Sequence, residues 1–311
     1  MTPQFLMNDK VFPLHVLFDT PWRDIPKDGW LLCTKYNQTL HNHRNSVYHG
    51  TVLIGKKIFH AWEKKDLELN PKIVLDRFCQ FLVVRDDLLP GGTKQRAHNF
   101  FNTIPNHEVV YAGPWNGFAQ VALSISSKVH KKRAVFFATR DDYKTNIRAQ
   151  MYGCKIHVIP HATLKELQEH ATKYSADHNA YLMNFGFDSV EFRRELLTSL
   201  RQAMNGTILH EDFKKTIWLA AGSGTLLKVL YDLFPQAKFG VVQVGKRIKT
   251  VDSSRTKLFI APERFYQEAE IKPPYPSVAT YDAKVWRFAY RYGTTGDVIW
   301  NVAGDSGCDS R

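Results

Sequence analysis

A lysine directly after a Pro-Gly-Gly turn is the first residue of this sequence that could do covalent chemistry. Lys94 follows Pro90-Gly91-Gly92-Thr93, where the apolar run 81–84 has given way to charged residues. Pro-Gly-Gly breaks regular structure strongly, and glycine lets the backbone pass close to another group. An amine held inside a folded domain loses solvent, so its pKa falls towards the range in which it acts as a nucleophile. A solvated loop lysine is the alternative interpretation, and a lone lysine does not decide between the two.

A second stretch has the composition of an anion-binding loop. Gly222-Ser223-Gly224-Thr225 lies between an apolar run, 216–221, and a helix-like segment, 226–234. A strand, a glycine-rich loop and a helix together present backbone N–H groups and a helix N-terminus to a phosphate. Ser223 and Thr225 add hydroxyl groups. The loop is neither GxGxxG nor the nucleoside-triphosphate loop, because no Gly-Lys-Ser/Thr follows at the required spacing. A tight turn without a ligand is the alternative.

Both stretches, and an asparagine between them, are carried by alternating strands and helices. Asn116 stands in a turn, 113–117, that joins a strand-like to a helix-like segment. Alternation of this kind indicates right-handed crossovers and parallel sheets, so the sequence predicts an α/β fold. The expected strands are 107–112, 134–138, 155–160, 216–221, 239–244 and 298–302, and the expected helices are 97–104, 118–125, 144–152, 163–174, 190–204, 226–234 and 283–290.

The first 80 residues are harder to interpret. Short strands are expected at 11–18 and 51–55. Four of the five histidines in this region stand at spacings that fit no familiar ligand set, and no cysteine or carboxylate completes one. No metal site is therefore predicted from His41, His43, His49 and His60.

The charge of the chain favours polyanionic partners. Among 311 residues, 42 Lys and Arg exceed 30 Asp and Glu, which gives a net charge of +12. Such an excess supports phosphate contacts with counterion release, although a basic enzyme whose charge is incidental is the alternative. The basic residues cluster at 56–57, 64–65, 131–133 and 246–257.

The sequence also gives expectations about location. No apolar run reaches membrane-spanning length, and the N-terminus shows no secretory signal, so no membrane partner is expected. The four cysteines are widely spaced without a CxxC pair, which is typical of reduced thiols in a cytoplasmic protein.

Together, Lys94, Asn116 and the 222–225 loop meet the requirements of pyridoxal 5′-phosphate: an amine, a donor beside the ring oxygen and a phosphate cradle. In this order they resemble the fold type II (tryptophan-synthase-β-like) pyridoxal-phosphate enzymes, nearest the aminocyclopropane-carboxylate deaminase and D-cysteine desulfhydrase branch. The "RDDL…GGNK.R" stretch of that branch is similar to residues 85–96, its "SNH" or "SGN" turn to 115–117, and its "GTGGT" loop to 221–225. The resemblance covers residues 81–304.

The resemblance implies a two-lobed α/β enzyme with parallel-rich sheets flanked by helices. Residues 1–97 and 185–311 would form the large cofactor-binding domain, although 1–80 match the family poorly, and 98–184 would form a small α/β domain. Lys94 would carry the Schiff base and then move a proton. A homodimer is implied, as is an amino-acid-like substrate in lyase, deaminase or decarboxylase chemistry.

Four positions depart from the family pattern. Trp115 stands where a small hydroxyl residue usually acts on the substrate, Thr93 replaces an asparagine, and Ala221 replaces a glycine. Ala303 is the nearest match to the serine or threonine that faces the pyridine nitrogen. Three neighbours remain open for that role: Asn301, Asp305 and Ser306.

Three functions remain open from the sequence. The basic charge favours an amino acid attached to a modified thymine, as in related-looking enzymes that hypermodify bacteriophage DNA, and a phage-encoded enzyme would work in the host cytoplasm. A deaminase or β-eliminase for free amino acids is the second interpretation. A non-catalytic, basic nucleic-acid-binding protein on the same scaffold is the third.

Overall fold

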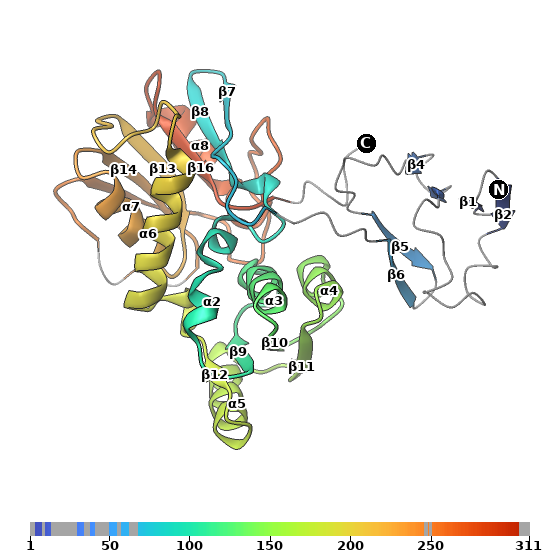
Figure 1. The fold of residues 1–311 in the computed structure, drawn as a ribbon. Helices are drawn as coiled ribbons and strands as arrows, with labels where there is room; N and C mark the ends of the chain where they lie inside the picture. Colours follow the sequence, from blue (N-terminus) through green and yellow to red (C-terminus); the bar gives the residue numbers. More distant parts are fainter. Residues whose placement is uncertain are drawn as a thin grey trace. The chain divides into compact units, whose positions relative to one another are not determined.

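The computed structural model describes residues 68–245, 248 and 251–304 in full, and in the first 67 residues the backbone of six strands. By its internal contacts the chain divides into two units, residues 1–68 with 307–311, and residues 69–306. Figure 1 shows the elements of each unit.

The first unit contains two small antiparallel sheets. One has the order β2-β1-β3-β4, formed by Lys10–Pro13, Gln4–Met7, Trp30–Cys33 and Gln38–Leu40. The other pairs β5 (Gly50–Ile54) with β6 (Lys57–Ala61). The side chains of His41, His43, His49 and His60 lie outside the described residues, so the prediction that they bind no metal stays a prediction.

The larger sheet of the second unit brings strands from both ends of the unit together. Its order is β15-β14-β13-β16-β8-β7, and every pair is parallel except β7 with β8. Because β16 pairs with both β13 and β8, the last strand of the unit lies inside the sheet. The strands are Thr256–Ile260, Lys238–Gln243, Thr216–Ala221, Val298–Asn301, Phe81–Arg85 and Leu75–Phe78.

The smaller sheet is entirely parallel. Its order is β11-β10-β9-β12, formed by Lys155–Val158, Arg133–Ala138, Glu108–Ala112 and Tyr181–Leu182. Parallel neighbours require crossover connections, and here α3 (Ala119–Val129), α4 (Lys144–Met151) and α5 (Leu164–Asp177) supply them. Both sheets belong to the unit 69–306, and the domain division at residues 98 and 184 stays a prediction.

Helices cover both faces of each sheet, and alternate side chains of a strand enter different cores. On β13, Leu219 packs in the core that contains α6 (Val190–Met204) and α7 (Thr225–Leu233), whereas Trp218 packs with α8 (Lys284–Tyr292). On β9, Tyr111 enters the first core and Val110 the core beneath α5. The predicted α/β fold with parallel-rich sheets between helices is therefore confirmed (Figure 1).

Two local expectations differ from the structure. The predicted helix 97–104 is a 3-10 turn, Thr93–Ala97, followed by the one-turn helix α2, Phe100–Thr103. The strands β7 and β15 are absent from the sequence-based prediction, because neither segment shows a continuous apolar run. Among the described residues, no helix is long and apolar enough to cross a membrane.

Candidate active site

The turn that carries Lys94 is held tightly against two other elements. Gly92 has φ +66°, and a Cβ there would lie 2.5 Å from the carbonyl oxygen of Val302, so only glycine fits. A Cβ on Gly91 would lie 2.9 Å from the Cα of Ala122 in α3. The backbone N–H of Thr93 donates to the Val302 oxygen at 2.9 Å. Lys94 therefore starts from a backbone fixed between α3 and the end of β16.

The Lys94 amine makes no hydrogen bond or ion pair with the described part of the chain. Burial lowers the pKa of Lys94 to about 8, although the negative charges of Asp282 and Asp188 act in the opposite direction. Compared with the ordinary value of 10.5, this raises the neutral, nucleophilic fraction at pH 7 roughly 300-fold. The pKa of Lys94, the lysine that the sequence singled out, therefore lies in the range that nucleophilic chemistry requires.

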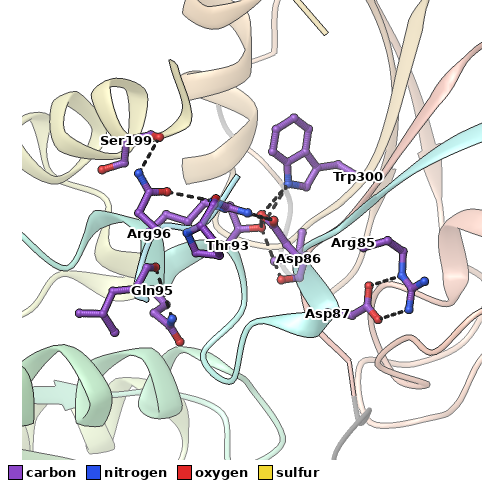
Figure 2. Close-up of polar contacts among 12 residues, drawn as sticks. Arg85, Asp86, Asp87, Thr93, Gln95, Arg96, Ser199 and Trp300 are labelled. Atoms are coloured by element: carbon purple, nitrogen blue, oxygen red, sulfur yellow. Dashed lines mark hydrogen bonds and ion pairs between the residues drawn. The ribbon is translucent and has the colours of Figure 1, made fainter. Parts of the chain in front are cut away.

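A buried ion pair explains the charged residues on either side of the turn (Figure 2). Asp86 Oδ1 accepts from Arg96 Nη2 at 2.7 Å and from Arg96 Nε at 3.1 Å, and both side chains are almost fully buried. Asp86 Oδ2 accepts from Thr93 Oγ1 at 2.6 Å and from Trp300 Nε1 at 3.3 Å. The pair thus links residues immediately before and after Lys94 to strand β16.

The residues next to this ion pair in the sequence are also held by hydrogen bonds. Arg85 holds Asp87 through two hydrogen bonds, Nε to Oδ1 at 2.8 Å and Nη2 to Oδ2 at 2.9 Å, and also contacts Asp76. Thr93 points its hydroxyl at Asp86, which accounts for a threonine at this position. Sequence reasoning named this stretch but gave these residues no role.

Asn116 reaches the same cavity as Lys94 from the turn after β9. Its side chain is buried, and Nδ2 has no partner among the described residues. The turn is rigid because Gln120 Nε2 and Thr145 Oγ1 donate to the carbonyl of Trp115, at 3.3 and 3.2 Å. A buried amide donor without an acceptor costs free energy, so an acceptor atom in the cavity, from a ligand or a water, would stabilise it.

The 222–225 loop forms another wall of this cavity, between β13 and α7. Gly224 caps α7 with φ +81°, so the first N–H groups of the helix face the loop. Thr225 Oγ1 donates to the carbonyl of Gly186 at 3.0 Å, and it therefore accepts from Ser223 Oγ at 2.9 Å. Both hydroxyl protons are thus engaged within the protein, and Ser223 would donate to an anion only by giving up its hydrogen bond to Thr225.

Asp282 is the functional candidate that the sequence analysis missed. It precedes α8, lines the cavity and is 4% exposed. One carboxyl oxygen accepts from the backbone N–H groups of Val302, at 3.4 Å, and Ala303, whereas Oδ2 has no partner among the described residues. Burial raises the pKa of Asp282 well above its usual range. No motif surrounds it, and the only signal was a lone carboxylate in a segment, 275–286, that also contains Tyr275, Tyr281 and Trp286.

The structure places the predicted site residues as follows. One cavity is lined by all of the predicted cofactor-binding residues: Lys94, Asn116, Gly222, Ser223, Gly224 and Thr225. Ala303 also lines this cavity, and its backbone N–H donates a hydrogen bond to Asp282. Asn301 instead donates to the carbonyl of Pro276 at 2.7 Å and does not line the cavity, whereas Asp305 and Ser306 lie outside the described residues.

Trp115 stands where the resemblance places a substrate-facing hydroxyl residue, but its ring does not line the cavity. It packs edge-on against Tyr143 with ring centroids 4.7 Å apart, and the Arg140 guanidinium lies 5.2 Å from its centroid. Pro114, Asn116 and Gly117 line the cavity from this turn, and Trp115 does not.

No family model and no curated protein matches the sequence. Solved structures do match. An ACC deaminase homologue has 14% identity and a TM-score of 0.63 over 78% of this chain and 92% of that one. A hydrogen sulfide-producing enzyme from Fusobacterium nucleatum has 12% identity and a TM-score of 0.57 over 80% and 100%. Serine racemase from maize has 12% identity and a TM-score of 0.53 over 76% and 89%.

At identities this low the likeness shows the fold alone. This chain has the fold of these enzymes over most of its length, as the sequence resemblance implied. The matched proteins are named for different reactions, so the likeness does not select one of them.

Proposed function

We propose that this protein is a pyridoxal-phosphate-dependent enzyme that acts on an amino-acid-like amine through Lys94. The observation that carries the proposal is one cavity that holds an amine of lowered pKa, an unsatisfied amide donor and a glycine-rich loop at a helix N-terminus. These three groups come from segments far apart in the sequence, and each matches a different part of the cofactor.

The cavity residues fit pyridoxal phosphate. Backbone N–H groups at 222–225, together with the start of α7, suit a phosphate, and Lys94 is the one cation among the described residues that line the cavity. Asn116 Nδ2 needs an acceptor, which the ring oxygen supplies. The unpartnered Oδ2 of Asp282 needs a donor, which a protonated ring nitrogen supplies.

The chain's own residues then have separate tasks in the reaction. When bound, the cofactor supplies an electron-withdrawing ring that stabilises negative charge at the substrate's α-carbon. Lys94, with a pKa of about 8, can accept and return a proton near neutral pH. Asp282, as a carboxylate beside the ring nitrogen, would hold a proton there and strengthen the electron withdrawal. Asn116 would fix the ring in its plane.

The first test is covalent attachment at Lys94. The purified protein, incubated with pyridoxal phosphate, should show a near-visible absorption band that borohydride abolishes. After reduction, cleavage after Arg85 and Arg96 should release residues 86–96 with the added mass on Lys94. Lys94→Ala should lack both band and adduct, because no other lysine among the described residues lines the cavity.

The matched control is Lys155→Ala, which removes an exposed lysine at the start of β11 and should leave band and adduct unchanged. Absence of a band in the unaltered protein, even with excess cofactor, would overturn the proposal. The non-catalytic interpretation would then be favoured.

A finer proposal concerns the substrate. An amino acid carried on a modified thymine in DNA is supported by the net charge of +12, with lyase, deaminase or decarboxylase chemistry at the amino acid. A deaminase or β-eliminase for free amino acids is the alternative, and turnover of free serine, cysteine or their D-forms would favour it. A homodimer and a cytoplasmic location are further parts of the proposal.

A further inference from the structure

Three phenylalanine rings line the cavity and pack on no other aromatic ring of the described residues. Phe118 precedes α3, Phe185 begins a 3-10 turn (Phe185–Phe187), and Phe265 lies between β15 and α8; all three are half-buried. Elsewhere aromatic rings pack on one another, as Phe100 does on Phe192, with centroids 5.6 Å apart. The three cavity rings therefore present aromatic surface to whatever the cavity binds.

The backbone packs directly against one of these rings. A Cβ at Gly245 would lie 2.9 Å from the ring of Phe265, so that ring lies against bare backbone after β14. The turn that carries Phe185 packs closely on the 222–225 loop, because a Cβ at Gly186 would lie 2.2 Å from Ser223 Oγ. Phe265 and the backbone of the Phe185 turn are therefore held against the segments around the anion-binding loop.

The proposed cofactor does not account for all three rings. A pyridine ring has two faces, and the Lys94 amine and the substrate amine must approach one of them. At most one phenylalanine can then stack on the cofactor, which leaves aromatic surface for the substrate. Aromatic surface that faces a cavity is satisfied best by another planar ring.

A cation adjoins one of these rings. The Arg148 guanidinium lies 5.4 Å from the centroid of Phe118, is half-buried, and has no hydrogen bond or ion pair with described residues. A positive charge over the ring favours electron-rich or anionic ligands beside it.

We propose that the substrate of this site carries a planar aromatic group, which Phe118, Phe185 and Phe265 bind beyond the reacting amine. This inference rests on the proposed function and narrows its substrate. The aromatic group has two sources, the side chain of an aromatic amino acid or a nucleobase, and the charge of Arg148 distinguishes them, because only the nucleotide brings a phosphate.

The experiment measures non-covalent binding to the borohydride-reduced holoenzyme by calorimetry. L-Phenylalanine should bind at least about tenfold more tightly than L-alanine, and measurably more tightly than L-cyclohexylalanine, which has similar size but no planar ring. Phe118→Leu and Phe265→Leu should each reduce this preference severalfold. Phe288→Leu, which alters a half-buried ring that contacts Phe259 outside the cavity, should leave it unchanged.

Thymidine 5′-monophosphate then identifies the source of the ring. If thymidine 5′-monophosphate competes with L-phenylalanine for the site, and Arg148→Gln weakens that competition about tenfold, the result supports the nucleobase. If the nucleotide does not compete, the result supports the amino-acid side chain. Equal affinity for L-phenylalanine, L-cyclohexylalanine and L-alanine would overturn the inference. If no adduct forms at Lys94, the proposed function fails separately, and the same titrations on the unloaded protein still test the aromatic subsite.

Discussion

The buried carboxyl group of Asp282 is unfavourable for the chain alone and would become favourable once the proposed cofactor is bound. Its carboxyl group is buried, one oxygen lacks a partner among the described residues, and burial raises its pKa well above the usual range. Below the unfolded-state pKa the group is neutral in both states and costs nothing through ionisation. As the pH rises, the unfolded chain loses this proton first, so the group progressively destabilises the fold.

Asp282→Asn should therefore stabilise the unloaded protein, with little effect near pH 4 and a gain of about 1–3 kcal/mol towards neutral pH. The same substitution should weaken pyridoxal phosphate binding, because a neutral amide does not compensate the positive charge of a protonated ring nitrogen. Thermal unfolding between pH 4 and 8, with and without cofactor, measures both effects. A loss of stability without cofactor at pH 7 would contradict this account of Asp282.

At the scale of elements, the Asp86–Arg96 pair joins the turn of Lys94 to β16. Replacing one partner of a buried ion pair leaves the other charge uncompensated. Asp86→Ala should lower the free energy of unfolding by about 3–5 kcal/mol, measured by urea denaturation. Asp142→Ala, which breaks the exposed pair between Arg140 and Asp142, is the control and should cost far less. Equal losses of unfolding free energy in the two variants would show that burial does not determine how much an ion pair contributes to stability.

The elements were largely predictable from the sequence, and their tertiary partners were not. Apolar runs such as 216–221 and 134–138 predicted strands because buried parallel strands are apolar on both faces. Lys94, Asn116 and the 222–225 loop were proposed as site residues because glycine turns mark their positions, and the structure brings them to one cavity. Asp282 and the partners of Asp86 were missed because their roles arise from contacts with residues 302 and 300, which no local pattern contains. The direction of the Trp115 ring was set in the same way, by Tyr143.

At the scale of the whole molecule, one of the basic clusters in the sequence, 131–133, lies away from the cavity. Lys132 Nζ donates to the carbonyl groups of Ile104 and Asn106, and Arg133 pairs with Glu108. This cluster lies at the N-terminal ends of β9 and β10, whereas Asn116 follows the C-terminal end of β9. The basic run 131–133 therefore lies at the N-terminal ends of the strands of the small sheet, and the cavity lies at their C-terminal ends.

If DNA is the substrate, the cations beside the cavity should determine its binding. Arg148→Gln should reduce the slope of log K against log salt by about 0.9 for duplex DNA, or about 0.7 for a single strand, because one phosphate contact is lost. Lys131→Gln, an equal change of charge at the distant edge, is the control and should leave the slope unchanged. Fluorescence anisotropy between low and physiological salt measures this. Equal changes of the salt slope in the two variants would indicate non-specific attraction of DNA to the whole surface. They would contradict DNA binding at the cavity.

The position of β16 also has a consequence for biosynthesis. It is the last of the described strands to be translated, yet it lies between β13 and β8, in the interior of the larger sheet. Until residue 301 emerges from the ribosome, both neighbours have unpaired edges, and Gly92 and Thr93 lack the Val302 carbonyl that they pack on and bond to. Exposed strand edges promote self-association, so the nascent chain is vulnerable for most of its synthesis. A premature stop shortly before β16 would remove the strand that completes the sheet around Lys94.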